Sequence, residues 1–239
     1  MRKRIWELDA LRGLSILGMV IIHLIFDLVD LYGLLNWEYP EWFWFIMQWG
    51  GVLFLLISGI SVTLGSRCVR RGILVFLFGM VCTGVTAGMY LLGLADKNII
   101  IYFGVLQCLG ACMLLWPLFR KLPPWALAAL GLIMVVIGLI LDRIPGTDVY
   151  WLMPFGVPWY TFASSDYFPL LPNLGFFLLG ALLGKTLYRE KKSLLPQVNE
   201  SNPVISFLRL CGRHSLWIYL LHQPILSGIC FLLMLLHNR

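Results

Sequence analysis

The fold is decided by residues 7–32, which read ELDALRGLSILGMVIIHLIFDLVDLY. The stretch exceeds the roughly 20 residues that a helix needs to cross a membrane. On a helix with about 100° per residue, four ionisable groups fall within roughly 40° of His23, which makes five on one narrow stripe. A charge facing lipid would cost about 3 kcal/mol, so this polar stripe must face a bundle interior or a water-filled cavity. It is therefore the first candidate site, and it consists of Asp9, Arg12, His23, Asp27 and Asp30.

The composition indicates an integral membrane protein. Hydrophobic residues make up 60% of the 239 residues and charged residues only 13%, whereas soluble domains carry about 25% charged residues. The net charge is +6. The basic residues lie in short loops between apolar runs, which is typical of topology signals rather than of nucleic-acid binding. We therefore predict a single all-α domain over residues 1–239, with membrane lipids as partners and no nucleic acid.

Apolar runs predict a polytopic bundle of about seven transmembrane helices in the plasma or inner membrane. Lys and Arg concentrate at the N-terminus (Arg2, Lys3 and Arg4) and after even-numbered spans, and few, such as the terminal Arg239, lie on the opposite side. This bias places the N-terminus in the cytoplasm and the C-terminus outside. Residues 142–168 then form an external loop, and residues 189–206 form a polar cytoplasmic loop. The predicted spans lie near 9–33, 42–65, 72–94, 99–119, 124–141, 169–188 and 214–236.

The polar stripe contains a candidate catalytic pair. Asp27 follows His23 by one helical turn, a spacing at which a carboxylate can reach an imidazole. A carboxylate bound to one ring nitrogen fixes the tautomer and leaves the other nitrogen to accept a proton. The alternative is a structural His–Asp pair inside the bundle. Near the cytoplasmic end, Asp9 and Arg12 form either an anchoring ion pair or part of a site for an anionic group.

Other polar and aromatic residues have both a structural and a functional interpretation. Gln107 and Asn173 are either hydrogen-bonding links between helices or substrate contacts near His23. His222 precedes Pro224 and either caps the irregularity that this proline causes or lines the same cavity as His23. Trp151 and Trp159 belong to an interfacial aromatic belt or to a lid that stacks on a sugar. No combination of Cys, His and carboxylates predicts a metal site.

Four stretches carry a resemblance to a known family. They are RIWELDALRGLSILGMVIIHLIFDL, VLFLLISGISVTL, FGVLQCLGACMLL and LCGRHSLWIYLLHQPI, and together they span most of the chain. In this order they resemble the family that contains the catalytic domain of heparan-α-glucosaminide N-acetyltransferase. The first stretch is also similar to the wider transmembrane acyltransferases, including acyltransferase-3, in which an Arg and a His on the first helix are signature residues.

The resemblance implies transfer of an acyl group, with acetyl as the expected one, from cytoplasmic acyl-CoA to a sugar or amino-sugar acceptor outside. In the lysosomal enzyme of this family, the catalytic His lies in the loop after the first helix. Here that loop reads LLNWEYPEW and has no His, so His23 takes its place. We then expect Asp27 to orient His23 and Gln107 or Asn173 to stabilise the oxyanion, with Asp30, His222 and the two tryptophans close to the acceptor.

The expected donor is acetyl-CoA, with no metal, and the chain is a candidate homodimer. The phosphates of acetyl-CoA are expected to bind at the basic cytoplasmic face. The alternative interpretation is that these basic residues are ordinary topology signals. The residues concerned are Arg12, Asp9, Arg67, Arg70, Arg71, Arg209 and Arg213. Two other functions fit the same stripe: a proton-coupled transporter that uses it as a relay, and a structural membrane protein without catalysis.

Overall fold

The computed structural model describes residues 4–198, 200 and 202–237. Arg2, Lys3 and Arg239, which the orientation prediction uses, lie outside the described residues. Within them the chain is helical, and the only β-type pairing is an isolated bridge between Phe103 and Tyr167. The all-α prediction is therefore confirmed. The chain forms two compact units: residues 1–54 with 192–239, and residues 55–191.

Five helices in the described residues are long and apolar enough to cross a membrane. They are α1, which continues into the π-helix η1 (Trp6–Leu31 together), α2 (Glu41–Leu64), α3 (Cys68–Leu91), α5 (Pro124–Leu141) and α8 (Ser215–His237). Two further apolar helices are shorter, α4 (Val105–Phe119) and α6 (Leu170–Thr186). The membrane character is thus confirmed, while the count of seven spans and the orientation stay predictions.

The start of the fourth predicted helix, near residue 99, is wrong: α4 begins at Val105. Residues 97–99 form instead the 3-10 turn η2 (Lys97–Ile99), and the chain is extended at Ile100 and at Gly104. The Asp166 carboxylate accepts a hydrogen bond from the Val105 amide at 3.1 Å. A carboxylate at this position satisfies one of the free N–H groups of a helix start and complements the helix dipole.

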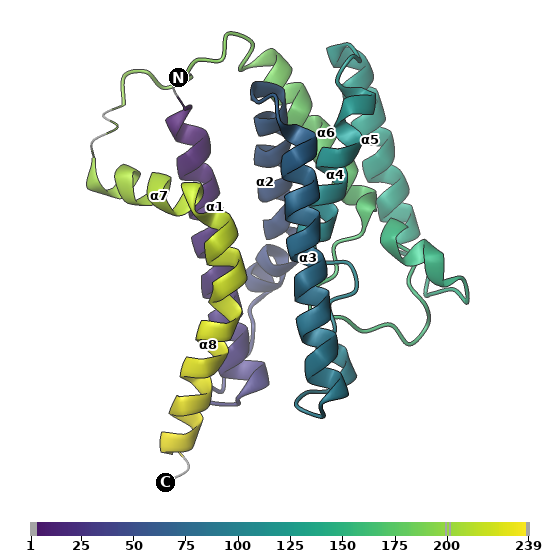
Figure 1. Ribbon diagram of the computed structural model, residues 1–239, viewed down its shortest axis with the longest axis vertical. Helices are drawn as coiled ribbons and strands as arrows, with labels where there is room; N and C mark the ends of the chain where they lie inside the picture. Colours follow the sequence, from purple (N-terminus) through teal and green to yellow (C-terminus); the bar gives the residue numbers. More distant parts are fainter. Residues whose placement is uncertain (1–3, 199, 201, 238–239) are drawn as a thin grey trace. The chain divides into compact units, whose positions relative to one another are not determined.

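The first unit is built on α1 (Trp6–Phe26), with α8 beside it and α7 (Pro203–Arg213) across it (Figure 1). The apolar pattern does not predict α7, because the first four residues of this helix fall in the connection 189–206 that was predicted to be a polar loop. Two local signals favour this helix. The Asn202 side chain accepts a hydrogen bond from the Val204 amide at 2.9 Å, and Pro203 occupies the first helical position, both of which are typical of helix starts.

Two glycines let the backbones of α1 and α7 touch. A Cβ at Gly13 would overlap the carbonyl oxygen of Leu208, and a Cβ at Gly212 would overlap that of Asp9. Small residues at such crossings are a common means of close helix packing in membranes. Here they bring α7 directly against the part of α1 that carries Asp9 and Arg12.

We expect Gly13→Ala to lower the free energy of unfolding by about 1–3 kcal/mol or more, since the new methyl group must push two backbones apart. The measurement is the melting temperature of the purified protein in detergent. Gly18→Ala on the same helix is the matched control, because nothing lies within 4 Å of its Cβ, and Ala favours a helix by up to about 1 kcal/mol over Gly. Equal melting temperatures for the two variants would contradict this account of the crossing.

In the second unit, α6 packs on α5 and on the second half of α2 through further close approaches. A Cβ at Gly59 would overlap the Phe177 carbonyl oxygen, and one at Gly180 would overlap that of Leu56. The loop of residues 142–168 contains the 3-10 helix η3 (Tyr150–Phe155) and is bound to the segment before α4. Ser164 Oγ, for example, donates to the Ile100 carbonyl oxygen at 2.9 Å.

Candidate active site

His23 lies in the last turn of α1, directly before η1 (Asp27–Leu31). In η1 the Tyr32 amide donates to the Asp27 carbonyl oxygen, five residues back, at 2.9 Å. Such π-bulges inside α-helices occur frequently at functional sites. The Tyr32 hydroxyl donates to the Ser227 carbonyl oxygen of α8 at 3.0 Å. This contact joins the end of η1 to α8, and Asp27 at the start of η1 is fully buried.

His23 and Asp27 share one polar cluster, but the Gln223 side chain of α8 stands between them. Nδ1 of His23 lies 3.1 Å from Oε1 of Gln223. Nε2 of Gln223 donates to the two Asp27 carboxylate oxygens at 2.9 and 3.1 Å. Ser227 Oγ adds a longer bond to the same carboxylate, at 3.4 Å. The predicted Asp27–His23 contact is therefore made through an amide, and no direct hydrogen bond joins the two in the described structure.

Of the residues 222–224, only His222 and Pro224 were given a role from the sequence, and Gln223 between them was given none. A signal was present: Gln223 and Ser227 are four residues apart, so they lie on one face of an apolar helix. What the spacing could not show is that this face meets the polar stripe of α1.

His222 is the second imidazole of the cluster, with its ring centroid 5.0 Å from that of His23 in an edge-to-face arrangement. Its Nδ1 lies 2.6 Å from the Tyr219 carbonyl oxygen. A carbonyl only accepts hydrogen bonds, so Nδ1 carries the proton and Nε2 has a free lone pair. The ring is 8% exposed and Nε2 is buried without a hydrogen-bond partner among the described residues. This bond goes to the carbonyl oxygen of Tyr219 and not to that of Leu220, which loses its helical donor at Pro224. The ring lies beside that of His23, and the two predicted roles of His222 stay predictions.

Asp30, the last member of the stripe, has a hydrogen-bond partner outside this cluster. Its carboxylate accepts a hydrogen bond from the Tyr39 hydroxyl, which lies in the connection between η1 and α2. Burial, together with the bond to Asp30, raises the pKa of Tyr39 to about 12. The phenol therefore stays protonated and donates at neutral pH. The predicted role of Asp30 in substrate binding stays a prediction.

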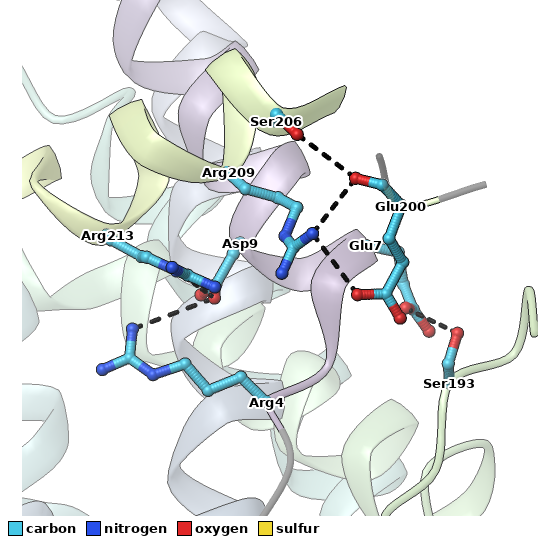
Figure 2. A network of polar contacts seen from close by, with 8 residues as sticks. All are labelled: Arg4, Glu7, Asp9, Ser193, Glu200, Ser206, Arg209 and Arg213. Atoms are coloured by element: carbon cyan, nitrogen blue, oxygen red, sulfur yellow. Dashed lines mark hydrogen bonds and ion pairs between the residues drawn. The ribbon is translucent and has the colours of Figure 1, made fainter. Parts of the chain in front are cut away.

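A second polar cluster surrounds Asp9 at the start of α1 (Figure 2). Asp9 is only 6% exposed, and its carboxylate forms ion pairs with Arg12 at 3.2 Å, Arg213 at 3.6 Å and Arg4 at 3.9 Å. Three guanidinium groups around one carboxylate leave a local excess of positive charge. The anchoring ion pair that the sequence suggested is present, and Arg213 of α7 joins it because Gly13 and Gly212 allow the helices to touch.

The neighbouring carboxylates hold the connection that precedes α7. Glu7 accepts hydrogen bonds from Ser193 Oγ and from the Leu194 amide, both at 2.8 Å. Arg209 pairs with the Glu200 carboxylate at 3.3 Å and donates to the Glu200 carbonyl oxygen at 3.2 Å (Figure 2). Arg209 is thus engaged within its own segment, while Arg4, Arg12 and Arg213 converge on Asp9. We call these three arginines and Asp9 the Asp9 cluster.

The remaining predicted site residues belong to the second unit. Gln107 uses both amide hydrogens, which donate to Gly79 at 3.0 Å and Thr83 at 2.8 Å, and its oxygen accepts from the Gly104 amide at 2.9 Å. Asn173 donates to the Pro169 carbonyl oxygen at 2.8 Å. These bonds support the structural interpretation of Gln107 in particular. The predicted oxyanion roles of both residues stay predictions.

The two tryptophans of the 142–168 loop have different surroundings. Trp159 packs in an aromatic cluster, with ring centroids 4.7 Å from Phe162 and 5.2 Å from Tyr102, whereas Trp151 is 69% exposed. At the junction of α2 and α3, Arg67 and Arg71 line a small pocket and Arg70 is exposed beside them. Their predicted roles are likewise untested. No group of three or more metal-binding side chains occurs among the described residues.

Comparison with known proteins supplies the family. Residues 4–224 match the family described as "Heparan-alpha-glucosaminide N-acetyltransferase, catalytic". No curated protein and no solved structure matches the chain significantly. The matched range contains the Asp9 cluster, His23, Asp27 and Gln223, and it leaves out only the ends of the chain. The protein therefore belongs to the family of the heparan-α-glucosaminide N-acetyltransferase catalytic domain, a family of membrane acetyltransferases.

Proposed function

We propose that the protein transfers an acetyl group from cytoplasmic acetyl-CoA to the hydroxyl or amine of a sugar or amino-sugar acceptor at the outer side of the membrane. The observation that carries the proposal is the part-buried polar cluster of His23, Asp27 and Gln223 inside a chain of this family. The family does not favour the transporter alternative.

His23 is the proposed general base. Its Nδ1 faces the Gln223 oxygen, so the lone pair of Nε2 is available for the acceptor. Nε2 takes the proton from the acceptor, whose oxygen or nitrogen attacks the thioester carbonyl. The carbon–sulfur bond then breaks, and the CoA thiolate receives the proton from the imidazolium. In the alternative route, Nε2 attacks the thioester carbonyl, the carbon–sulfur bond breaks and CoA leaves as the thiolate. The acceptor then takes the acetyl group from Nε2, and its proton passes to the thiolate.

The Asp9 cluster is the proposed binding site for the phosphates of CoA. Its three arginines exceed the single charge of Asp9, and guanidinium groups bind phosphate with two parallel hydrogen bonds. Arg12 and His23 are eleven residues apart on α1, which corresponds to about 16 Å of helical rise. The pantetheine arm of the donor would span this distance to bring the thioester to His23. Arg67, Arg70 and Arg71 are further candidates for the same role.

Trp151 is the proposed acceptor platform of the 142–168 loop. Its ring is exposed and flat apolar surfaces suit the faces of sugars, whereas the ring of Trp159 is occupied by its aromatic neighbours.

The donor site is tested by the melting temperature of the detergent-purified protein. Acetyl-CoA is expected to raise it, because a ligand that binds only the folded state stabilises that state. Acetyl-pantetheine, which lacks the nucleotide and its phosphates, should not. In Arg12→Ala the acetyl-CoA affinity should fall about tenfold, since a charged hydrogen bond contributes about 1.5–3 kcal/mol.

Arg143→Ala is the matched control, because it removes the same charge from an exposed position in the loop after α5. Its acetyl-CoA affinity should equal that of the wild type. An unchanged affinity in Arg12→Ala, or an equal loss in both variants, would remove the Asp9 cluster from the donor site. Absence of any shift with acetyl-CoA, together with absence of acetyl transfer to glucosamine, would contradict the proposed function itself.

A further inference from the structure

We propose that Gln223 is a positioning residue through which the charge of Asp27 sets the tautomer of His23. The inference rests on the proposed function, in which His23 is the base, and it adds a member that neither the family match nor the sequence pattern assigns. Its basis is the order of the three side chains: carboxylate, amide, imidazole.

The carboxylate decides how the amide is turned. An ionised carboxylate only accepts hydrogen bonds, so the NH2 group of Gln223 must face Asp27. Nε2 lies 2.9 and 3.1 Å from the two carboxylate oxygens, and 3.3 Å from Ser227 Oγ. Both amide hydrogens therefore have acceptors on this side. The amide oxygen is left facing Nδ1 of His23.

The amide in turn decides where the proton of the imidazole lies. An amide oxygen is an acceptor, so Nδ1 of His23 must carry the hydrogen and Nε2 must hold the lone pair. With this tautomer, Nε2 can take a proton from the acceptor. Asp27 thus orients the base without touching it, and the neutral amide allows a fully buried carboxylate to remain hydrogen-bonded.

Loss of the charge at Asp27 should release this arrangement. An asparagine at position 27 offers either an oxygen or an NH2 group, so the Gln223 amide can turn over. Its NH2 group would then donate to Nδ1 of His23, and the proton of the ring would move to Nε2. In that tautomer His23 cannot act as the base at Nε2. The effect of Asp27→Asn is therefore expected to operate through Gln223.

The structure also provides an internal reference for this effect. Nδ1 of His222 bonds to the Tyr219 backbone carbonyl, so its tautomer does not depend on Asp27 or Gln223. A change at Gln223 should therefore affect the tautomer of His23 and leave that of His222 unchanged.

The tautomers are measured directly by 15N NMR of the protein labelled at histidine, with His23 assigned by the loss of its signals in His23→Ala. In the wild type both His23 and His222 should carry the proton on Nδ1. Asp27→Asn and Gln223→Met should shift the population of His23 toward the Nε2–H form and leave His222 unchanged. Ser227→Ala, which removes a bond to the same carboxylate but does not touch the ring, should keep His23 on Nδ1–H.

Acetyl transfer provides a second readout as a double-mutant cycle. Asp27→Asn and Gln223→Met should each lower kcat about 100-fold or more, and the double variant should be no slower than the slower single variant. Multiplied losses in the double variant would show that Asp27 acts on His23 without Gln223, and would overturn the proposal. A wild-type His23 that carries its proton on Nε2 would overturn it as well.

The proposal for Gln223 stays testable if a variant fails to fold or if the wild type shows no acetyl transfer. If Gln223→Met fails to fold because it leaves the Asp27 carboxylate with fewer donors, Gln223→Asn replaces it: this variant keeps an amide that is one methylene too short to span both partners. If the wild type transfers no acetyl group, the proposed function fails. The tautomers measured by NMR still decide whether Gln223 positions the ring.

Discussion

His23→Ala is expected to abolish acetyl transfer, with a loss in kcat of about 1,000-fold or more. The physical reason is the loss of the only proposed proton acceptor, since a general base contributes about 100- to 10,000-fold. Acetyl-CoA binding should be largely retained, because Arg12, the α1 arginine of the Asp9 cluster, lies about 16 Å from His23 by helical rise. The measurement combines radiolabelled acetyl transfer with the acetyl-CoA melting shift of the same preparation.

His214→Ala is the matched control for this variant. His214 is exposed at the junction of α7 and α8, so its removal should leave kcat and the melting shift unchanged. Full turnover in His23→Ala would show that the cluster is structural. In that case His222, whose buried Nε2 has no hydrogen-bond partner among the described residues, would become the next candidate for the base.

The second large effect is expected for Asp9→Asn, which should lower the free energy of unfolding by about 3 kcal/mol. Removing one partner of a buried ion pair leaves charge without compensation, at a cost of about 3–5 kcal/mol, and the partial exposure of the arginines lowers this value. Here Arg12 and Arg213 would lose the carboxylate between them. Arg4→Ala is the control, because its side chain is exposed and a surface ion pair contributes only about 0–1 kcal/mol. The melting temperatures of both variants are compared with that of the wild type.

The same variant distinguishes a donor site from a purely structural cluster. If the arginines bind the phosphates of CoA, the ligand supplies the negative charge that Asp9→Asn lacks. Acetyl-CoA should then raise the melting temperature of Asp9→Asn by more than that of the wild type. An equal or smaller rise would show that the Asp9 cluster only holds α7 against α1.

Helical periodicity and apolar length predicted those features of the chain that depend on one helix. The spacing of polar residues in α1 and η1 was sufficient to place His23 and Asp27 on one stripe, and both do lie in one part-buried cluster. Apolar length was sufficient to find the long helices, including the bounds of α5 at residues 124 and 141. Both inferences succeed because they depend on one helix at a time: its period, its length and the cost of charges in lipid.

What a single helix cannot reveal is the neighbour that its polar face meets. Gln223 is 200 residues from His23 in the chain, and only the packing of α8 on α1 and η1 inserts its amide between His23 and Asp27. Arg213 likewise reaches Asp9 only because Gly13 and Gly212 let α7 cross α1 in backbone contact. A periodic pattern fixes the direction of a side chain around its own axis, whereas the partner in that direction is set by the packing of segments far apart in sequence. The sequence alone thus determined the membrane class and the polar stripe, and the tertiary structure decided that Asp27 meets His23 through Gln223.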